Sequence, residues 1–152
     1  MKRAAVFTSF ICILSLALLV GCATGPKGPT DEELVMQQVQ ALIDDLFAGN
    51  VDNLLSYVSE DFYHYEAGDK ASLADHLEQG KQMGYTENVP GWLEEHEAEV
   101  NLDQAVVTVD GNKATVYPIE ISGDLGSVTV ELGYQKDADG VWRIVEADVE
   151  GV

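Results

Sequence analysis

A histidine and a glutamate lie two residues apart in a short aromatic segment, where they could carry out acid–base chemistry. The residues are His64 and Glu66, and Phe62 precedes them at the same spacing. Because side chains alternate between the two faces of a strand, a strand here would place all three on one face. If Phe62 points into the protein interior, the imidazole and the carboxyl group also face the interior and could act as a general acid–base pair. The same pattern also fits two solvated groups beside the Gly68-Asp69 turn.

Five aromatic residues could line an apolar pocket and orient a ligand through their polar tips. They are Tyr57, Phe62, Tyr117, Tyr134 and Trp142. Ordinary packing in the core or between subunits is the alternative for these side chains.

The sequence contains no motif for metal binding, phosphate binding or serine hydrolysis. His76 and His96 lie in acidic stretches that are typical of solvated surface, and their spacing fits no metal-ligand motif. A glycine-rich phosphate loop before a helix and a serine nucleophile elbow are both missing. We therefore expect no metal and no cofactor.

Helical patterns dominate residues 30–84. Thr30 and Glu33 have the spacing of a capping box, and Gly49 is suited to end the helix that follows. We expect a second, short helix over 51–58, a short strand over 61–66, and a third helix from Asp69 to Gly80 or Gly84. Residues 85–90 are expected to form a loop.

The period changes from helical to two after residue 94, which predicts strands. The phase slips near Asp103-Gln104, which suggests a bulge or a bend. Turn sequences, including Asp137-Ala138-Asp139-Gly140, separate three further strands. In the last of them Trp142 and Ile144 alternate with Val145, so apolar residues fall on both faces and the second face could meet another subunit. Helices followed by an antiparallel meander predict an α+β fold with the helices on one sheet face.

Two segments and the order of the elements are similar to those of a known superfamily. The segments are Phe47-Ala48-Gly49-Asn50-Val51-Asp52 and Ser59-Glu60-Asp61-Phe62-Tyr63-His64-Tyr65-Glu66. The resemblance is to the NTF2-like superfamily, which includes nuclear transport factor 2, SnoaL-like polyketide cyclases, ketosteroid isomerase and scytalone dehydratase. It covers residues 31–149 and implies a cone-shaped, cystatin-like fold, with about three N-terminal helices packed on a curved antiparallel sheet around a pocket.

The resemblance also implies where an active site and a dimer contact would lie. In isomerase-like members a carboxylate base follows the second helix, at a position that Glu66 matches. The tyrosine that those members use on the first helix corresponds to Leu42. Glu131 lies near the position of the acid that they use on a late strand, but alternation places it on the opposite strand face from Leu132. We therefore do not expect this chain to share the isomerase activity of those members. Many members dimerise through the outer sheet face, which implies a possible homodimer here.

The N-terminus resembles the signal peptide of a bacterial lipoprotein. Lys2 and Arg3 precede an apolar run over 4–20, and Leu19-Val20-Gly21-Cys22 is similar to a lipobox. This predicts a signal peptide over 1–21, a lipidated Cys22 in a flexible tether over 22–30, and one domain over 31–152. An uncleaved anchor helix is the alternative. Because Ala23 is not the aspartate that retains lipoproteins at the inner membrane, we expect the outer membrane, on its periplasmic face, in a Gram-negative host.

The charge balance excludes one class of partner. The chain has 27 acidic and 8 basic residues and a net charge of −19. Such a surface repels nucleic-acid phosphates, so we expect no nucleic-acid binding. It also repels anionic lipid headgroups, so we expect that the lipid alone anchors the protein. Solubility or a saline habitat would explain the acidity, and so would a cationic partner.

These features together predict a membrane-anchored lipoprotein of the cell envelope with a non-catalytic role. It would bind a small apolar ligand in the cone or an envelope protein partner. The alternative is a SnoaL-like isomerase, cyclase or dehydratase with His64 and Glu66 as its acid–base pair, and a third option is a structural role through oligomerisation. A deep cone lined by that pair would favour an enzyme or a ligand, whereas a cone filled by Phe62, Trp142 and the first helix would contradict both and leave a protein partner.

Overall fold

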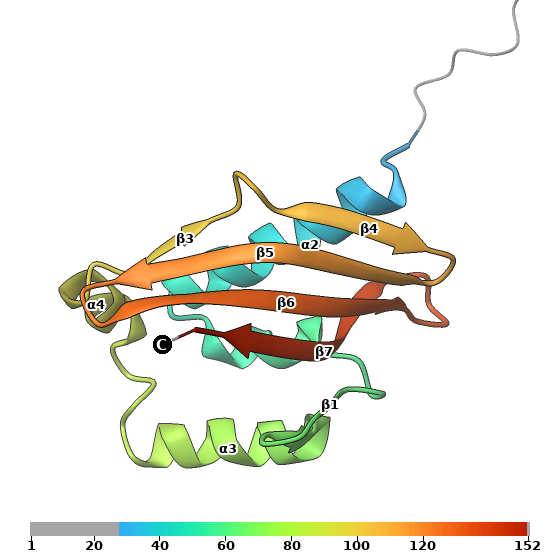
Figure 1. Cartoon of the computed structure of the whole chain (residues 1–152). Coiled ribbons are helices and arrows are strands. Elements are labelled where there is room, and N and C mark those ends of the chain that lie inside the picture. The colour runs from blue at the N-terminus through green and yellow to red at the C-terminus, as the bar shows by residue number, and fades with distance from the viewer. Residues whose placement is uncertain (1–27, 152) are drawn as a thin grey trace, which may run out of the picture.

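The computed structural model describes residues 28–151, in which one layer of helices packs on an antiparallel sheet (Figure 1). The predicted signal peptide, Cys22 and most of the tether lie outside the described residues. Predictions about them remain predictions.

The long helix α2 (Asp31–Phe47) begins and ends as its sequence predicts. The Thr30 hydroxyl accepts a hydrogen bond from the Glu33 N–H at 3.2 Å, and the Glu33 carboxylate accepts one from the Thr30 N–H at 2.8 Å. Gly49 follows the helix at a φ of 75°, which glycine adopts without strain. Val35 and Val39, one turn apart, are fully buried against the sheet.

Three further helical segments and a small hairpin follow α2. The short 3-10 helix η1 (Val51–Tyr57) leads to the two-residue strands β1 (Tyr63–His64) and β2 (Gly68–Asp69), which pair with each other. Helix α3 (Lys70–Gln82) starts where Asp69 accepts a hydrogen bond from the Ser72 N–H at 2.9 Å. Helix α4 (Val89–Glu95) lies where the sequence predicts a loop for its first residues. Pro90 suits the start of this helix for two reasons. It lacks the N–H that would have no partner in the first turn, and its ring fixes φ at a helical value.

The main sheet has five strands, all antiparallel to their neighbours. β3 (Glu99–Asn101) and β4 (Val106–Asp110) both pair with β5 (Lys113–Gly123), because the chain leaves the sheet at the predicted slip near Asp103. β6 (Gly126–Lys136) and β7 (Trp142–Glu150) complete the meander. The predicted α+β cone with helices on one sheet face is confirmed.

A bulge in β7 corrects one expectation. Gly133 pairs with Glu146, but the next residue, Tyr134, pairs with Ile144, so Val145 has no partner across the strand. This extra residue brings Trp142 and Ile144 onto the inner face of the sheet. The predicted second apolar face of this strand is therefore wrong, and the subunit contact suggested for it stays a prediction.

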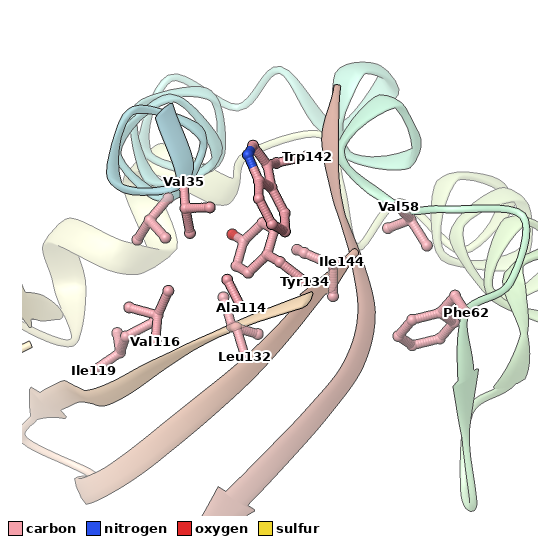
Figure 2. Packing of buried hydrophobic residues seen from close by; sticks show 11 residues of the cluster. Val35, Val58, Phe62, Ala114, Val116, Ile119, Leu132, Tyr134, Trp142 and Ile144 are labelled. Carbon is pink, nitrogen blue, oxygen red and sulfur yellow. The ribbon is translucent and has the colours of Figure 1, made fainter. Parts of the chain in front are cut away.

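The core lies between α2 and the inner face of the sheet (Figure 2). Trp142 and Tyr134 are 2% and 1% exposed, and they occupy the space under Val35 and Val39. Val116 of the neighbouring strand is also fully buried. We call this part, beside the β6–β7 turn, the closed end, and the part beside α4 and the β5–β6 turn the open end.

Candidate functional site

The structure places His64 and Glu66 on the β1–β2 hairpin. β1 ends at His64, and the chain turns at residues 65–67, so the predicted strand face does not extend to Glu66. Glu66 is exposed. The Nδ1 atom of His64 accepts hydrogen bonds from the N–H groups of Glu66 at 3.2 Å and Ala67 at 3.1 Å. The imidazole therefore stabilises this turn, and the carboxylate points to solvent rather than into the cone.

The five predicted pocket residues do not surround one cavity. Phe62, Tyr134 and Trp142 are buried and fill the core. Tyr57 is half-buried and donates its hydroxyl hydrogen to Asp45 at 2.6 Å, and this bond raises the pKa of Tyr57 to about 12. Tyr117 is 43% exposed, beside the bulge of β5. These side chains pack and cap the fold rather than line a ligand site.

The hydroxyl group of Tyr134 is an unusual feature of the closed end. It is buried, and it has no hydrogen-bond partner among residues 28–151. Burial raises the pKa of this phenol. A buried hydroxyl without a partner destabilises the folded state, since it forfeits its bonds to water.

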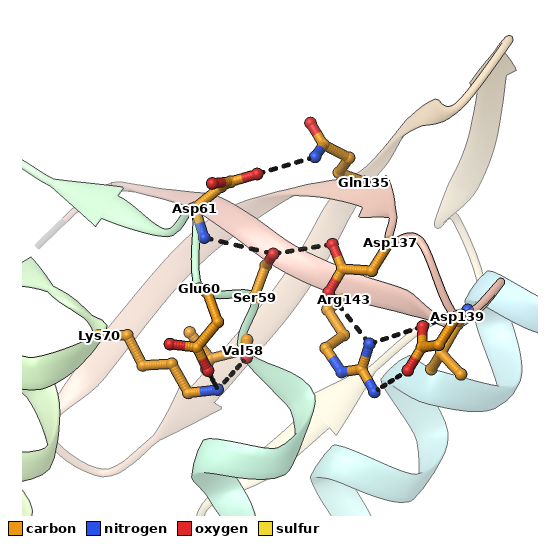
Figure 3. A network of polar contacts seen from close by, with 10 residues as sticks. Val58, Ser59, Glu60, Asp61, Lys70, Gln135, Asp137, Asp139 and Arg143 are labelled. Atoms are coloured by element: carbon orange, nitrogen blue, oxygen red, sulfur yellow. Dashed lines mark hydrogen bonds and ion pairs between the residues drawn. The ribbon is translucent and has the colours of Figure 1, made fainter.

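An ion network holds the outer side of the closed end (Figure 3). Arg143 bridges Asp137 at 3.0 Å and Asp139 at 2.8 Å. The buried Ser59 donates its hydroxyl hydrogen to Asp137 at 2.9 Å. Hydrogen bonds from Arg143 and the Val141 N–H lower the pKa of Asp139 to about 2. Gly140 adopts a φ of 81°, which confirms the predicted hairpin turn, and the network fixes that turn to the segment after η1.

An apolar groove of about 370 Å³ lies at the open end. Its walls come from α4 and from the β5–β6 hairpin. The apolar side chains that line it are Trp92, Leu93, Ala98, Ile121, Leu125 and Val128. Trp92 is 51% and Leu125 70% exposed, so the groove presents large apolar side chains to solvent. Exposed apolar surface of this kind, gathered in a hollow, is typical of a binding site.

A histidine–aspartate pair at this groove fixes α4 to the β5–β6 turn. His96 Nδ1 lies 3.1 Å from Asp124 Oδ1, and the Asp124 N–H donates to the His96 carbonyl oxygen at 3.0 Å. The imidazole packs on the Trp92 ring, with 4.6 Å between the ring centroids. At Gly123 a Cβ atom would lie 2.6 Å from the same carbonyl oxygen, so this close approach requires glycine. Trp92 is thus held in place beside the groove.

A second hollow adjoins the groove, and its polar lining is acidic. We call it the acidic hollow. Glu94, Glu97, Glu99 and Asp124 line it, and it shares Leu93, Ala98, Ser122 and Gly123 with the apolar groove. Among residues 28–151 only Asp124 of these four carboxylates contacts a basic side chain, that of His96.

Residues 28–151 contain no group of three or more histidine, cysteine or acidic side chains placed to hold a metal ion. Within the same range, no helix has both the length and the apolar character needed to cross a membrane.

Sequence reasoning missed this groove because it assigned the first residues of α4 to a loop. The usable signal was Pro90 followed by Trp92 and Leu93, which is typical of a short helix that begins with proline and has apolar side chains. His96 was assigned to a solvated acidic stretch, and its partner Asp124 lies 28 residues away.

Comparisons with known proteins identify the fold. No protein-family model and no curated protein matches the sequence. An NTF2-like protein with a cystatin-like fold from Novosphingobium aromaticivorans matches with a TM-score of 0.54 at 15% identity, over 98% of this chain and 90% of that one. A candidate dehydratase of the NTF2-like family from Streptomyces avermitilis gives a TM-score of 0.53 at 16% identity, over 80% and 96%.

A candidate ketosteroid isomerase from Parabacteroides distasonis gives a TM-score of 0.53 at 10% identity, over 85% of this chain and 93% of that one. At these identities the likeness shows the fold and not the activity. The chain therefore has the NTF2-like, cystatin-like fold that its sequence resembles.

Proposed function

We propose that this chain is a lipid-anchored binding protein of the bacterial envelope, which holds a small apolar ligand without covalent chemistry. The site is the apolar groove at the open end. The observation that carries the proposal is the half-exposed Trp92, which His96 holds beside the exposed Leu125. Apolar side chains held exposed in a hollow gain free energy when a ligand removes them from water.

The size of the groove favours a small ligand over a protein partner. Its volume of about 370 Å³ lies within the range of roughly 300–1,000 Å³ that small-molecule sites occupy. Phe62, Trp142 and the first helix fill the closed end, which counts against the expected ligand inside the cone and in favour of a protein partner. The groove lies outside this filled part, so a ligand can bind at the rim.

The geometry favours binding over the alternative of a SnoaL-like isomerase, cyclase or dehydratase. An acid–base pair must face a bound substrate. Glu66 faces solvent, and the Nδ1 atom of His64 already accepts two backbone hydrogen bonds.

A homodimer through the outer sheet face has less support than ligand binding. Val106 and Tyr117 are exposed apolar residues on that side. Glu131 and Asp148 pair across β6 and β7 on the same face, and a second copy would bring like charges together. High salt or low pH would be needed to weaken this repulsion.

Membrane attachment is the other half of the proposal. Leu19-Val20-Gly21-Cys22 supports cleavage before Cys22 and acylation of its thiol. Two or more acyl chains hold a protein stably at a bilayer, with the domain on the periplasmic face of the outer membrane in a Gram-negative host. The mass of the N-terminal peptide tests this directly, because a lipidated peptide beginning at Cys22 is expected. An intact N-terminus at Met1 would contradict it.

Native mass spectrometry of the protein from its own host tests ligand binding. We expect a retained small-molecule mass that disappears after mild organic extraction. The Trp92→Ala variant should lose this mass, whereas Tyr63→Ala, which removes an exposed aromatic residue from β1, should retain it. Loss in both variants, or retention in both, would contradict the groove as the site.

A further inference from the structure

We propose that the ligand is an organic cation, with its apolar body in the groove and its ammonium group between Trp92 and the acidic hollow. This inference rests on the proposed function, since it assigns the chemical class of the ligand for the same groove.

The first argument is charge. Glu94, Glu97 and Glu99 line a hollow that shares four residues with the groove, and they take part in no ion pair within residues 28–151. Carboxylates gathered in one hollow repel one another, and the concave surface concentrates their field. A cation at the junction of hollow and groove would relieve this repulsion, whereas an anion would increase it.

The second argument is the exposed indole ring. A tryptophan face attracts an ammonium group more strongly than other aromatic rings do, and quaternary ammonium ligands are typically held in this way. Trp92 is 51% exposed at the groove, and the next residue, Leu93, lines both the groove and the acidic hollow. The open end therefore offers apolar surface, an aromatic face and carboxylates in one place.

The backbone at Glu97 follows from the end of α4 and is not itself a sign of a ligand. Its φ is 49°, and no other described residue except glycine has a positive φ. The Glu97 N–H donates to the Glu94 carbonyl oxygen at 3.2 Å, and the Ala98 N–H donates to the Leu93 carbonyl oxygen at 2.9 Å, which closes the helix in a Schellman motif. Glycine or asparagine would be more stable than glutamate at this position. The motif places Glu97 in the lining of the hollow, where a variant can test its carboxylate.

A metal ion and a basic peptide account for these features less well. The carboxylates do not form a group that could hold a metal ion in the described chain. A basic peptide would satisfy the charge, but the groove has the volume of a small-molecule site. The size of the groove therefore favours a small amphiphilic cation.

A matched series of probes tests the inference. Octyltrimethylammonium, 1-octanol and octyl sulfate share one alkyl chain and differ in charge. In calorimetric titrations of the purified protein below micelle concentrations, we expect the cation to bind about tenfold more tightly than octanol. Octyl sulfate should bind more weakly than octanol. Binding of octanol tests the proposed function, and the difference between the probes tests the charge assignment.

Two neutralising variants separate a local effect from the overall acidity of the chain. Glu97→Asn should weaken octyltrimethylammonium binding about threefold and leave octanol binding unchanged. Glu131→Gln removes an exposed charge from the outer sheet face and should change neither. Equal losses in the two variants would show that the total charge is responsible and would overturn the inference.

Three results of the probe series would also overturn it. If octanol and the cation bind equally, the proposed function stands and the cation assignment fails. If a basic peptide binds and no octyl probe does, the occupant is a protein and both proposals fail. If nothing binds at the groove, both proposals fail as well.

Discussion

The two tryptophans of this chain show how differently its two ends are built. Trp142, at the closed end, is 2% exposed, and its indole N–H donates to Asp31 at 3.1 Å. Trp92, at the open end, is 51% exposed and contacts His96. One side chain is enclosed by α2 and the sheet, whereas the other is presented to solvent.

The charged groups of the two ends differ in the same way. At the closed end Arg143 pairs with both Asp137 and Asp139, and Lys136 pairs with Asp31 at 2.6 Å. At the open end only one carboxylate of the acidic hollow has a basic side chain as its partner among residues 28–151, since Asp124 contacts His96. The charged groups named at the closed end thus have partners among its own residues. The open end lacks both apolar cover and counter-charge, and a ligand would supply them.

The largest expected effect distinguishes the two tryptophans by stability. Trp142→Ala would leave a cavity under Val35 and Val39, and it should lower the free energy of unfolding by about 3–5 kcal/mol. Trp92→Ala removes a half-exposed side chain and should cost less than about 1 kcal/mol. Urea unfolding monitored by circular dichroism measures both. Similar losses in the two variants would show that the open end is also a structural core.

A smaller effect is expected at the buried hydroxyl of the closed end. Tyr134→Phe removes a hydroxyl that lacks a partner among residues 28–151 and keeps the ring in place. The free energy of unfolding should rise by about 1 kcal/mol, because the unfavourable burial of the hydroxyl is removed. The same unfolding experiment applies. A loss of stability would indicate that the hydroxyl has a bound water or another partner.

A gain in stability is also expected at the open end. Glu97→Asn should raise the free energy of unfolding by about 0.5 kcal/mol, since asparagine tolerates a positive φ better than glutamate does. Glu95→Asn is the matched control, because Glu95 ends α4 in a helical conformation. A gain from both variants would mean that loss of negative charge, and not relief of backbone strain, is the cause.

The smallest expected effect concerns pH at the closed end. Arg143 lowers the pKa of Asp139 to about 2 from its usual value of 3.8. The folded state therefore gains stability from this carboxylate above pH 4 and loses it as the pH falls toward 2. Asp139→Asn removes this contribution, so the stability difference between wild type and variant should shrink over that interval. A difference that does not change with pH would contradict the ion pair.

Local sequence signals predicted the elements that depend on neighbouring residues. The capping box at Thr30 and Glu33, the end of α2 at Gly49 and the turn at Gly140 follow from contacts within a few residues. The inner face of β6 was likewise predictable, because the residues that share it alternate along the strand with those of the other face. The fold class was predictable because these local patterns agree with one another.

Features that depend on distant residues were not predictable in the same way. The bulge at Val145 depends on pairing with β6 and cannot be found by counting alternation along β7. His96 meets Asp124 only because Gly123 lets the β5–β6 turn approach the end of α4. The prediction that His64 and Glu66 act as a pair assumed a strand over 61–66, but β1 has only two residues and ends at His64. The candidate groove therefore appeared only in three dimensions.

The indole N–H signals of the two tryptophans test the central claim most directly. The chain has two tryptophans, so a ¹H–¹⁵N spectrum has one side-chain signal for each, and Trp92→Phe identifies them. During titration with octyltrimethylammonium, we expect the signal of Trp92 to shift and that of Trp142 to remain unchanged. A shift of the Trp142 signal, or a titration that moves neither, would contradict ligand binding at the open end.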